Sequence, residues 1–388
     1  MIPVRYNLRS LAVRKATTLA TGVGIALVVF VLASALMLSA GIKKTMATSG
    51  KRDTAIVLRQ GSDAELGSSI EEPNVNLVLA APGVKKESGV PSGVGEVIVV
   101  AATPKLGATG VSNVQFRGVT DDVMKFRPEV KIVAGRAAQP GSDEVLIGAR
   151  LRGRFLGLDL GQSFDIKKNR PVTVVGVFES GGSSYESEVW VDRDLLRAAY
   201  GRQGHVSSVR VHLDSASAFD GFQASVEQDK RIGLMAERES DYYEKQSEGT
   251  SLFIGAMGTL IAVFFSIGAM IGATITMYAA VANRQREIGT LRALGFSRLS
   301  ILGSFLLEAL ILALGGGLLG AIASIGMGSV HLSMMNMASW SEISFSFDPT
   351  PEILTKALLF AGFMGLLGGF LPAIRASRVS PVAAMRGM

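Results

Sequence analysis

The stretch "SLFIGAMGTLIAVFFSIGAMIGATITMYAAVAN" at residues 251–283 carries no charged side chain. A helix rises about 1.5 Å per residue, so roughly 30 helical residues overshoot the hydrocarbon core of a bilayer, which is about 30 Å thick. This stretch therefore predicts a membrane-spanning helix that projects beyond the bilayer.

Three further uncharged stretches lie at 17–42, at 299–330, where Glu308 is the sole charge, and between Lys356 and Arg375. Charged residues make up 19% of the chain, against about 25% in soluble domains. The sequence predicts a membrane protein with four transmembrane α-helices and an α+β extracytoplasmic domain inserted between the first and second helices.

The first stretch could also be a signal peptide, because "SALMLSAG" at residues 34–41 offers small residues for cleavage. Its apolar run is longer than the 7–15 residues of a typical signal sequence. Its length favours a helix that stays as a membrane anchor.

The basic residues predict the orientation in the membrane. Three basic clusters fall on one side of a four-helix topology, whereas the 331–355 connection has three acids and no Lys or Arg. We therefore expect an inner (plasma) membrane protein with both termini and the 284–298 loop in the cytoplasm and the large domain outside. The clusters are Arg5, Arg9, Arg14 and Lys15; Arg284, Arg286, Arg292 and Arg298; and Arg375, Arg378 and Arg386. Because these clusters account for the net charge of +6 as a signal of membrane orientation, the charge no longer supports nucleic-acid binding.

Runs rich in Val and Ile predict strands in the inserted domain, and Gly, Pro and Ser clusters separate them. Helices are expected at 149–157 and 216–229, and the polar 237–250 segment is expected to continue the second spanning helix as a stalk. The predicted strands are residues 54–59, 96–102, 144–148, 172–178, 188–192 and 208–213.

Catalytic and metal-binding patterns are missing from the sequence. It contains no cysteine, and its three histidines, His205, His212 and His331, are far apart. No phosphate-binding loop, nucleophile elbow or zinc-protease motif is present. We expect a non-catalytic chain that binds no cofactor and no metal.

The segment "NRQREIGTLRALGFSRLSI" at 283–301 predicts a short amphipathic helix at the membrane surface, with Ile288, Leu291 and Leu294 about one turn apart. Gly295 is placed to end this helix, and Ser297 is placed to cap the next one. From the residues alone, an ordinary positive-inside loop is an equal alternative.

The same segment resembles the hallmark of the MacB/FtsX-type permeases of ABC transporters. The ending "LPAIRASRVSPVAAMR" (371–386) and the opening "NLRSLAVRKATTLATGVGI" (7–25) resemble that family's terminal signatures. Within the domain, "DEVLIGARLRGRFLGLDLGQSFDI" (143–166) and "VTVVGVFESGG" (172–182) resemble its periplasmic core.

The resemblance implies a permease subunit that works with a separate ABC ATPase chain (a MacB/LolD-like nucleotide-binding domain), which binds ATP and Mg. It also implies a second permease subunit, as a homodimer or a heterodimer, a periplasmic membrane-fusion adaptor, contact with membrane lipid, and mechanotransmission of ATP hydrolysis to the outer domain. Residues of the coupling helix are expected to contact the ATPase: Arg284, Arg286, Glu287, Ile288, Gly289, Leu291, Arg292, Leu294 and Gly295.

With this resemblance, the chain divides into nine expected segments. They are a cytoplasmic N-terminal segment (1–16), transmembrane helix 1 (17–42), a periplasmic MacB-like core (43–245), transmembrane helix 2 with stalk (246–283), a coupling helix (284–298), transmembrane helix 3 (299–330), a short periplasmic loop without assigned role (331–355), transmembrane helix 4 (356–374) and a cytoplasmic C-terminus (375–388).

Glu308 would lie roughly 10 Å into the third span. A carboxylate there either makes an interhelical contact that supports the coupling region, as the resemblance favours, or snorkels to the interface. Three Gly-xxx-Gly pairs, at 268/272, 316/320 and 365/369, are expected to be helix-packing sites first and a dimer seam second.

Several functions stay open. The leading one is export or extraction of a hydrophobic or amphipathic substrate. A lipoprotein-releasing (LolC/LolE-like) permease and an FtsX-like regulator of periplasmic enzymes are alternatives within the family. A membrane scaffold without an ATPase is an alternative outside it. An outward-facing enzyme would need a cluster of titratable residues in the domain, and no such cluster is expected.

Overall fold

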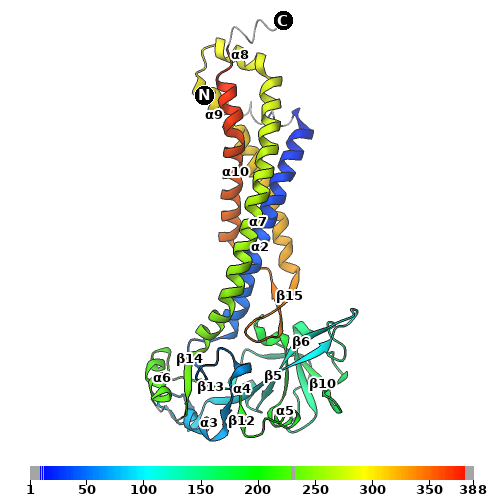
Figure 1. Ribbon diagram of the computed structural model, residues 1–388, viewed down its shortest axis with the longest axis vertical. Helices are drawn as coiled ribbons and strands as arrows, with labels where there is room; N and C mark the ends of the chain where they lie inside the picture. Colours follow the sequence, from blue (N-terminus) through cyan, green and yellow to red (C-terminus); the bar gives the residue numbers. More distant parts are fainter. Residues whose placement is uncertain (1–8, 10, 12, 229–231, 381–388) are drawn as a thin grey trace. The chain divides into compact units, whose positions relative to one another are not determined.

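The apolar stretches form long helices in the computed structural model, which describes residues 9, 11, 13–228 and 232–380 (Figure 1). Within those residues, four helices are long and apolar enough to cross a membrane, which confirms the predicted number. They are α2 (Lys15–Ser49), α7 (Glu239–Asn283), α9 (Arg298–Ile325, extended by the 3-10 turn η5, Gly326–Ser329) and α10 (Pro351–Ser377).

The helix limits differ from the predicted ones. The fourth helix was expected from residue 356, the last charge before its apolar run, yet α10 begins at Pro351. Thr350 caps it, because its hydroxyl oxygen accepts from the amide of Ile353, and proline suits the first helical turn. Most of the predicted 1–16 segment and residues from 381 onward lie outside the described part of the chain.

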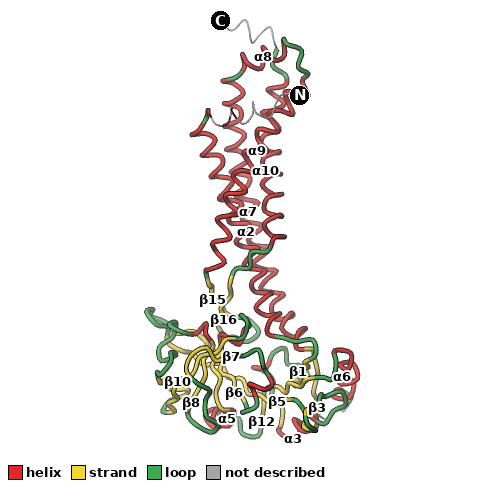
Figure 2. The backbone as a smooth tube through the Cα atoms, turned by 180° about the vertical axis from the view of Figure 1, so that it is seen from behind, coloured by secondary structure: helices red, strands yellow, loops and turns green. Residues whose placement is uncertain are grey.

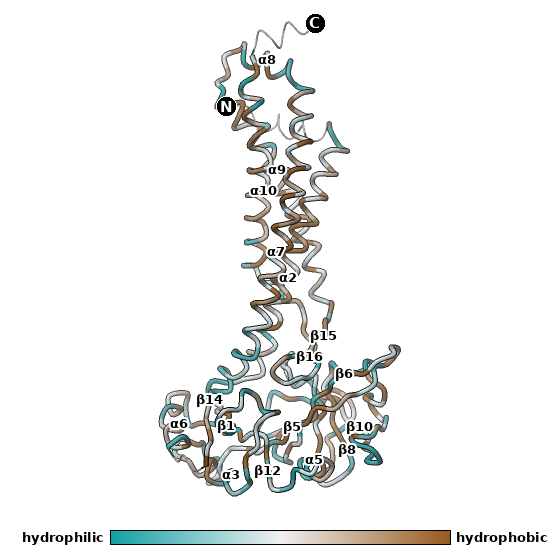
Figure 3. The backbone as a smooth tube through the Cα atoms, viewed as in Figure 1, coloured by the Kyte–Doolittle hydropathy of each residue, from teal (hydrophilic) through white to brown (hydrophobic). Residues whose placement is uncertain are grey.

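The second apolar stretch is one continuous helix with its polar N-terminal extension. The expected stalk is helical from Glu239 onward, whereas residues 237 and 238 end a strand. Along α7 the residues change from hydrophilic to hydrophobic, as the colours of Figure 3 show. The helix therefore contributes to both units into which the chain divides.

One unit, the helical unit, contains the residues up to Ala40, Ser251–Val330 and those from Phe347 on. Glycines allow its helices to approach closely. A Cβ at Gly316 or Gly320 would lie within 2.6 Å of a carbonyl oxygen of α2, and one at Gly365 or Gly369 would lie within 2.4 Å of an alanine Cβ of α9. Two of the three predicted glycine pairs are therefore packing sites within the chain.

The other unit, the core domain, comprises Gly41–Thr250 and His331–Ser346. Among the described residues, ten strands form one sheet in the order β14-β1-β13-β5-β6-β11-β8-β10-β7, with β9 beside β10. Figure 2 shows the strands of the core domain in yellow. They are β1 (Thr54–Arg59), β5 (Gly93–Pro104), β6 (Val111–Val119), β7 (Lys131–Gly135), β8 (Glu144–Gly148), β9 (Ser163–Lys167), β10 (Arg170–Glu179), β11 (Glu188–Asp192), β13 (Ser208–His212) and β14 (Leu234–Arg238).

Two pairs of strands, β6 with β11 and β8 with β10, are parallel, and the others are antiparallel. The entry strand β1, which follows α2, pairs directly with the exit strand β14, which precedes α7. Helices α3 (Glu72–Leu79), α4 (Val123–Phe126), α5 (Arg193–Tyr200) and α6 (Phe219–Glu227) and the small pairs β2 (Ile70–Glu71) with β12 (His205–Val206) and β3 (Lys86–Glu87) with β4 (Val90–Pro91) complete the inserted part. The α+β prediction is confirmed.

All six predicted strands occur, but the helix expected at 149–157 is wrong. Only the 3-10 turn Ala149–Leu151 forms there, and Phe155 makes a bridge with Lys105 instead. Gly153 and Gly157 have φ of +65° and +78°, which ends any helix. The helix expected at 216–229 begins with a 3-10 turn and runs as α6 to Glu227, while residue 229 lies outside the described chain.

The 331–355 connection is not a plain loop. It forms the hairpin β15 (His331–Met335) with β16 (Glu342–Ser346), which belongs to the core domain. The sequence of β16, EISFS, alternates polar and apolar residues, yet its first four residues are all buried, because the strand packs against the domain.

Candidate functional site

The segment between α7 and α9 forms the short helix α8 (Gln285–Ala293). Gly295 has a φ of +92°, and the amide of Phe296 donates to the carbonyl of Leu291, so the helix ends where the sequence predicted. The hydroxyl oxygen of Ser297 accepts from the amide of Ser300 and caps α9, as also predicted.

Arg284 joins three helices at the start of α8. Its Nη1 lies 3.1 Å from Oε2 of Glu308 in α9, and both side chains are buried. Its Nε donates to Oε2 of Glu287 at 3.0 Å, and its guanidinium lies 5.4 Å from the ring centre of Phe305. Glu308 therefore makes the interhelical contact, and the alternative of snorkelling does not describe this structure.

The expected coupling residues divide into inward and outward groups. Ile288 packs in an apolar cluster with residues of α7, α9 and α10, whereas the exposed positions lie at the surface. Arg284, Ile288 and Gly289 are buried, Leu291 and Arg292 are half-buried, and Arg286, Glu287, Leu294 and Gly295 are exposed.

Leu294 departs from the expected apolar face. It lies beyond the last helical residue, Ala293, and 72% of it is exposed, while Leu299 at the start of α9 is 78% exposed. Sequence reasoning did not single out Leu299, although its place two residues after the cap makes it a first-turn position. Two large apolar side chains thus face outward beside α8.

A second cluster lies inside the core domain, where no cluster of titratable groups was expected. Arg117 in β6 donates to Glu188 in β11 at 2.7 Å and to Glu96 in β5 at 2.8 Å, and it also pairs with Glu65. Arg210 in β13 pairs with Glu65 at 2.6 Å and Glu96 at 2.7 Å. These side chains are almost fully buried.

The first turn of α7 enters the same cluster. Glu239 accepts from Nε of Arg210 at 2.8 Å and from the hydroxyl of Tyr185 at 3.2 Å. The hydroxyl of Tyr242 accepts from the amide of Glu65 at 3.1 Å. The base of α7 is therefore bound to the sheet by polar contacts rather than by apolar packing alone.

Electrostatics keep the carboxylates of Glu65 and Glu96 ionised at neutral pH. Burial would raise the pKa of Glu65, but the charges of Arg117 and Arg210 outweigh it and lower the pKa. Burial opposes ionisation of Glu96 in the same way, yet Arg127, Arg117 and Arg210 lower its pKa to about 2. Burial raises the pKa of Tyr185 to about 12. None of these groups is tuned for proton transfer near pH 7, so the cluster fits a structural role.

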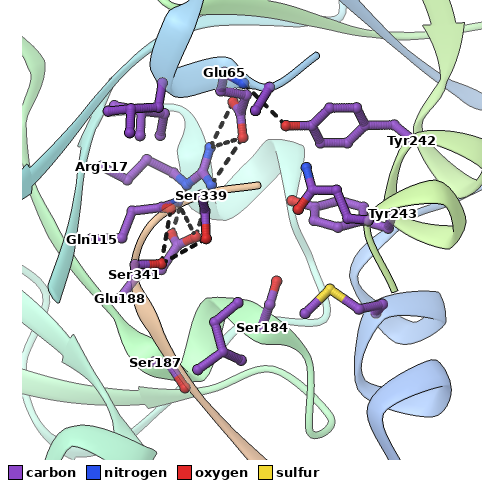
Figure 4. A pocket seen from close by; sticks show the side chains of 16 residues that line it. Glu65, Gln115, Arg117, Ser184, Ser187, Glu188, Tyr242, Tyr243, Ser339 and Ser341 are labelled. Atoms are coloured by element: carbon purple, nitrogen blue, oxygen red, sulfur yellow. Dashed lines mark hydrogen bonds and ion pairs between the residues drawn. The ribbon is translucent and has the colours of Figure 1, made fainter. Parts of the chain in front are cut away.

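Beside the cluster lies a polar cavity of about 20 Å³, shown in Figure 4. Its volume suits about one water molecule rather than an organic substrate. Side chains of the sheet, the base of α7 and the 331–346 hairpin all line it, including Arg117, Glu188, Tyr242, Ser339 and Ser341. Three parts of the core domain therefore meet at this point.

Among the described residues, no three His, Asp or Glu side chains are grouped as a metal site. The histidines lie in separate places: His205 beside Ser69, His212 stacked on Phe126, and His331 beside Ser346.

Comparisons with known proteins agree with both units. The family model of the MacB-like periplasmic core domain matches residues 16–229, which is more than half of the chain, and that of the FtsX-like permease C-terminal domain matches residues 259–381. The chain belongs to the MacB/FtsX-like family of ABC transporter permeases.

Curated relatives of this MacB/FtsX-like permease include a macrolide export ATP-binding/permease protein MacB of Salmonella paratyphi A, 31% identical over 56% of this chain and 34% of the relative. A probable export ATP-binding/permease protein of Pseudomonas fluorescens is 30% identical over 70% of this chain and 43% of the relative. The matches thus span about a third to two fifths of the length of these relatives.

Among solved structures, the periplasmic region of MacB from Actinobacillus actinomycetemcomitans is similar with a TM-score of 0.38 and 12% identity, over 53% of this chain and 97% of that one. The extracellular domain of the transporter YknZ from Gram-positive bacteria has a TM-score of 0.36 and 18% identity, over 47% and 99%. The family membership rests on the sequence matches.

Proposed function

We propose that this chain is the transmembrane subunit of an ABC transporter in which α8 docks a partner ATPase. That partner binds ATP and Mg, and its hydrolysis cycle drives a conformational change of the core domain outside the membrane. The substrate class is hydrophobic or amphipathic, and the transporter exports it or extracts it from the membrane.

The observation that carries this proposal is the construction of α8. The nine-residue helix α8 is fixed to α9 by the Arg284–Glu308 ion pair, and its Ile288 is buried. Arg286 and Leu294 remain exposed. A rigid element with exposed apolar and charged side chains is what a docking protein requires. The positive side chains around it support a cytoplasmic location.

The continuity of α7 supports the second half of the proposal. One helix runs from Asn283, next to α8, to Glu239, which binds Arg210 in the core domain. A displacement of α8 along the axis of α7 would therefore be transmitted through this continuous helix to the charge cluster. The pairing of two permease subunits and a periplasmic adaptor complete the proposed assembly.

Co-purification tests the proposal. The tagged full chain is co-expressed in turn with each ABC ATPase of its source organism that has no transmembrane segment of its own. We expect one ATPase to co-purify in nanodiscs and its ATP hydrolysis rate to change on binding. A chain that binds none of them while remaining folded would contradict an ABC role and favour the scaffold function.

A further inference from the structure

The hairpin β15–β16 connects α9 to α10 in the sequence and yet packs as part of the core domain. Its turn is tightly built, since Oδ1 of Asn336 accepts from the amides of Ala338 and Ser339. Trp340 has a φ of +54°, which is unfavourable for a bulky residue and indicates that surrounding contacts hold the turn in place.

Glu342 holds the hairpin to the domain. Its side chain is 5% exposed, and it pairs with Arg154, accepts from the hydroxyl of Ser112 and lies 2.9 Å from Nζ of Lys105. These partners come from the tips of β5 and β6 and from the loop after β8. Burial would raise the pKa of Glu342, but the hydrogen bonds of Ser112 and Lys105 and the charge of Arg154 lower it, so the carboxylate stays charged.

Backbone contacts reinforce this attachment. The guanidinium of Arg150 donates to the carbonyl of Ser344 and pairs with Glu186 at 3.0 Å. The amide of Ser344 donates to the hydroxyl of Ser187 at 3.1 Å. The amide group of Asn113 donates to the carbonyl of Trp340. All these partners lie on β6 or beside β8 and β11.

The two ends of the inserted domain enter it at the other end of the sheet, although Ser49 of α2 and Glu239 of α7 also bind Ser184 and Tyr185, which lie just before β11. Strand β1 follows α2, and strand β14 precedes α7. Glu239, in the first turn of α7, binds Arg210 of β13. These strands form one end of the sheet, in the order β14-β1-β13, whereas the hairpin contacts the half that contains β6, β11, β8 and β10. The β14-β1-β13 end is thus joined directly to α2 and α7, whereas the other half receives the hairpin in addition to the contacts of Ser49 and Glu239.

We propose that Glu342 is a positioning residue through which the α9–α10 connection anchors the β6–β11–β8–β10 half of the core domain, making the hairpin a second mechanical link. In a working transporter, α7 would act directly on the β14-β1-β13 end, and the hairpin would add a second path to the other half. The source of the motion rests on the proposed function, but the anchoring itself does not.

Hydrogen–deuterium exchange of the full chain in nanodiscs tests the anchoring. We expect Glu342→Gln to speed amide exchange by about tenfold in the hairpin and in residues 104–112 and 144–154, because a buried charged hydrogen-bond acceptor is lost. Exchange in β1, β13 and β14 should stay unchanged. Glu352→Gln, in the exposed first turn of α10, is the matched control and should alter neither half.

Two results would overturn the proposal. One is unchanged exchange in residues 144–154 in Glu342→Gln, since the hairpin would then anchor nothing. The other is equally faster exchange in both halves, since Glu342 would then support the whole domain without selectivity. Retention of the native oligomer on size exclusion verifies that each variant is folded.

A second measurement adds the co-purified ATPase with ATP and vanadate. We expect nucleotide to change exchange in both halves of the wild-type domain, and in Glu342→Gln to change it clearly less in β8 and β10 while the change in β1, β13 and β14 is kept. An undiminished response in β8 and β10 of the variant would overturn the mechanical link. A wild-type chain without any nucleotide response would contradict the proposed function, while the first measurement still decides the anchoring.

Discussion

Arg284 at the start of α8 and Glu308 in α9 form a buried ion pair, with 3.1 Å between Nη1 and Oε2. Replacing Glu308 with alanine leaves the guanidinium buried with one carboxylate fewer, which costs about 3–5 kcal/mol in comparable buried pairs. We expect a clear fall in the thermal unfolding temperature of the full chain in nanodiscs.

The control is Glu287→Ala, which removes the exposed partner of the same arginine. Exposed pairs contribute about 0–1 kcal/mol, so this variant should unfold close to the wild type. Equal destabilisation by both substitutions would show that the buried Glu308 contact contributes no more to stability than the exposed Glu287 contact.

The two exposed leucines beside α8 provide a test of docking. We expect Leu294→Asp to weaken binding of the partner ATPase by about tenfold or more, because a charge replaces an apolar contact, without lowering the unfolding temperature. Leu77→Asp is the matched control, since Leu77 is a similarly exposed leucine of the core domain. Titration of the ATPase against each variant measures the effect, and equal affinity for both would place docking elsewhere.

Glycine packing makes a third prediction. Gly320→Ala would place a Cβ 2.2 Å from the carbonyl oxygen of Ala26, so the α2 backbone must shift, at about 1–3 kcal/mol. Gly268→Ala meets nothing within 4 Å in the chain and should leave thermal stability unchanged. A loss of dimer on size exclusion in Gly268→Leu alone would assign this third glycine pair to contact between two copies.

The charge cluster predicts an acid-sensitive core domain. The pKa of Glu96 is about 2 in the folded domain, below its ordinary value of 4.5, so ionised Glu96 stabilises the fold above about pH 4.5. That contribution is lost as the pH falls from about 4.5 towards 2. Trp190 is buried beside Glu188, so its fluorescence in a Trp340→Phe background should report earlier urea unfolding at pH 3 than at pH 6. Identical unfolding midpoints at the two pH values would contradict this prediction.

Local chemistry explains what could be predicted from the sequence. The absence of charge predicted the spans, and Gly295 and Ser297 marked the end of α8 and the start of α9 because a left-handed glycine and a capping serine act within a few residues. The helix predicted at 149–157 fails because Gly153 and Gly157 adopt left-handed φ values, which a helix does not allow.

Long-range pairing explains what could not be predicted. Arg117 meets Glu65 and Glu188 across 52 and 71 positions of the chain, so no spacing rule brings these charges together. The same holds for Glu342, whose partner Arg154 is 188 positions away. Such contacts depend on strand order, and the strand order here interleaves distant segments.

The pairing of β1 with β14 also has a consequence for synthesis. Strand β1 ends at Arg59, and its neighbour β14 begins at Leu234, about 175 residues later. At about 5–20 residues per second, the ribosome needs roughly ten to thirty seconds to deliver the missing strand. During that interval Ala55, Ile56 and Val57, which end fully buried, lack the partner strand on the β14 side of β1. The sheet is therefore completed only when the residues directly before α7 have been made.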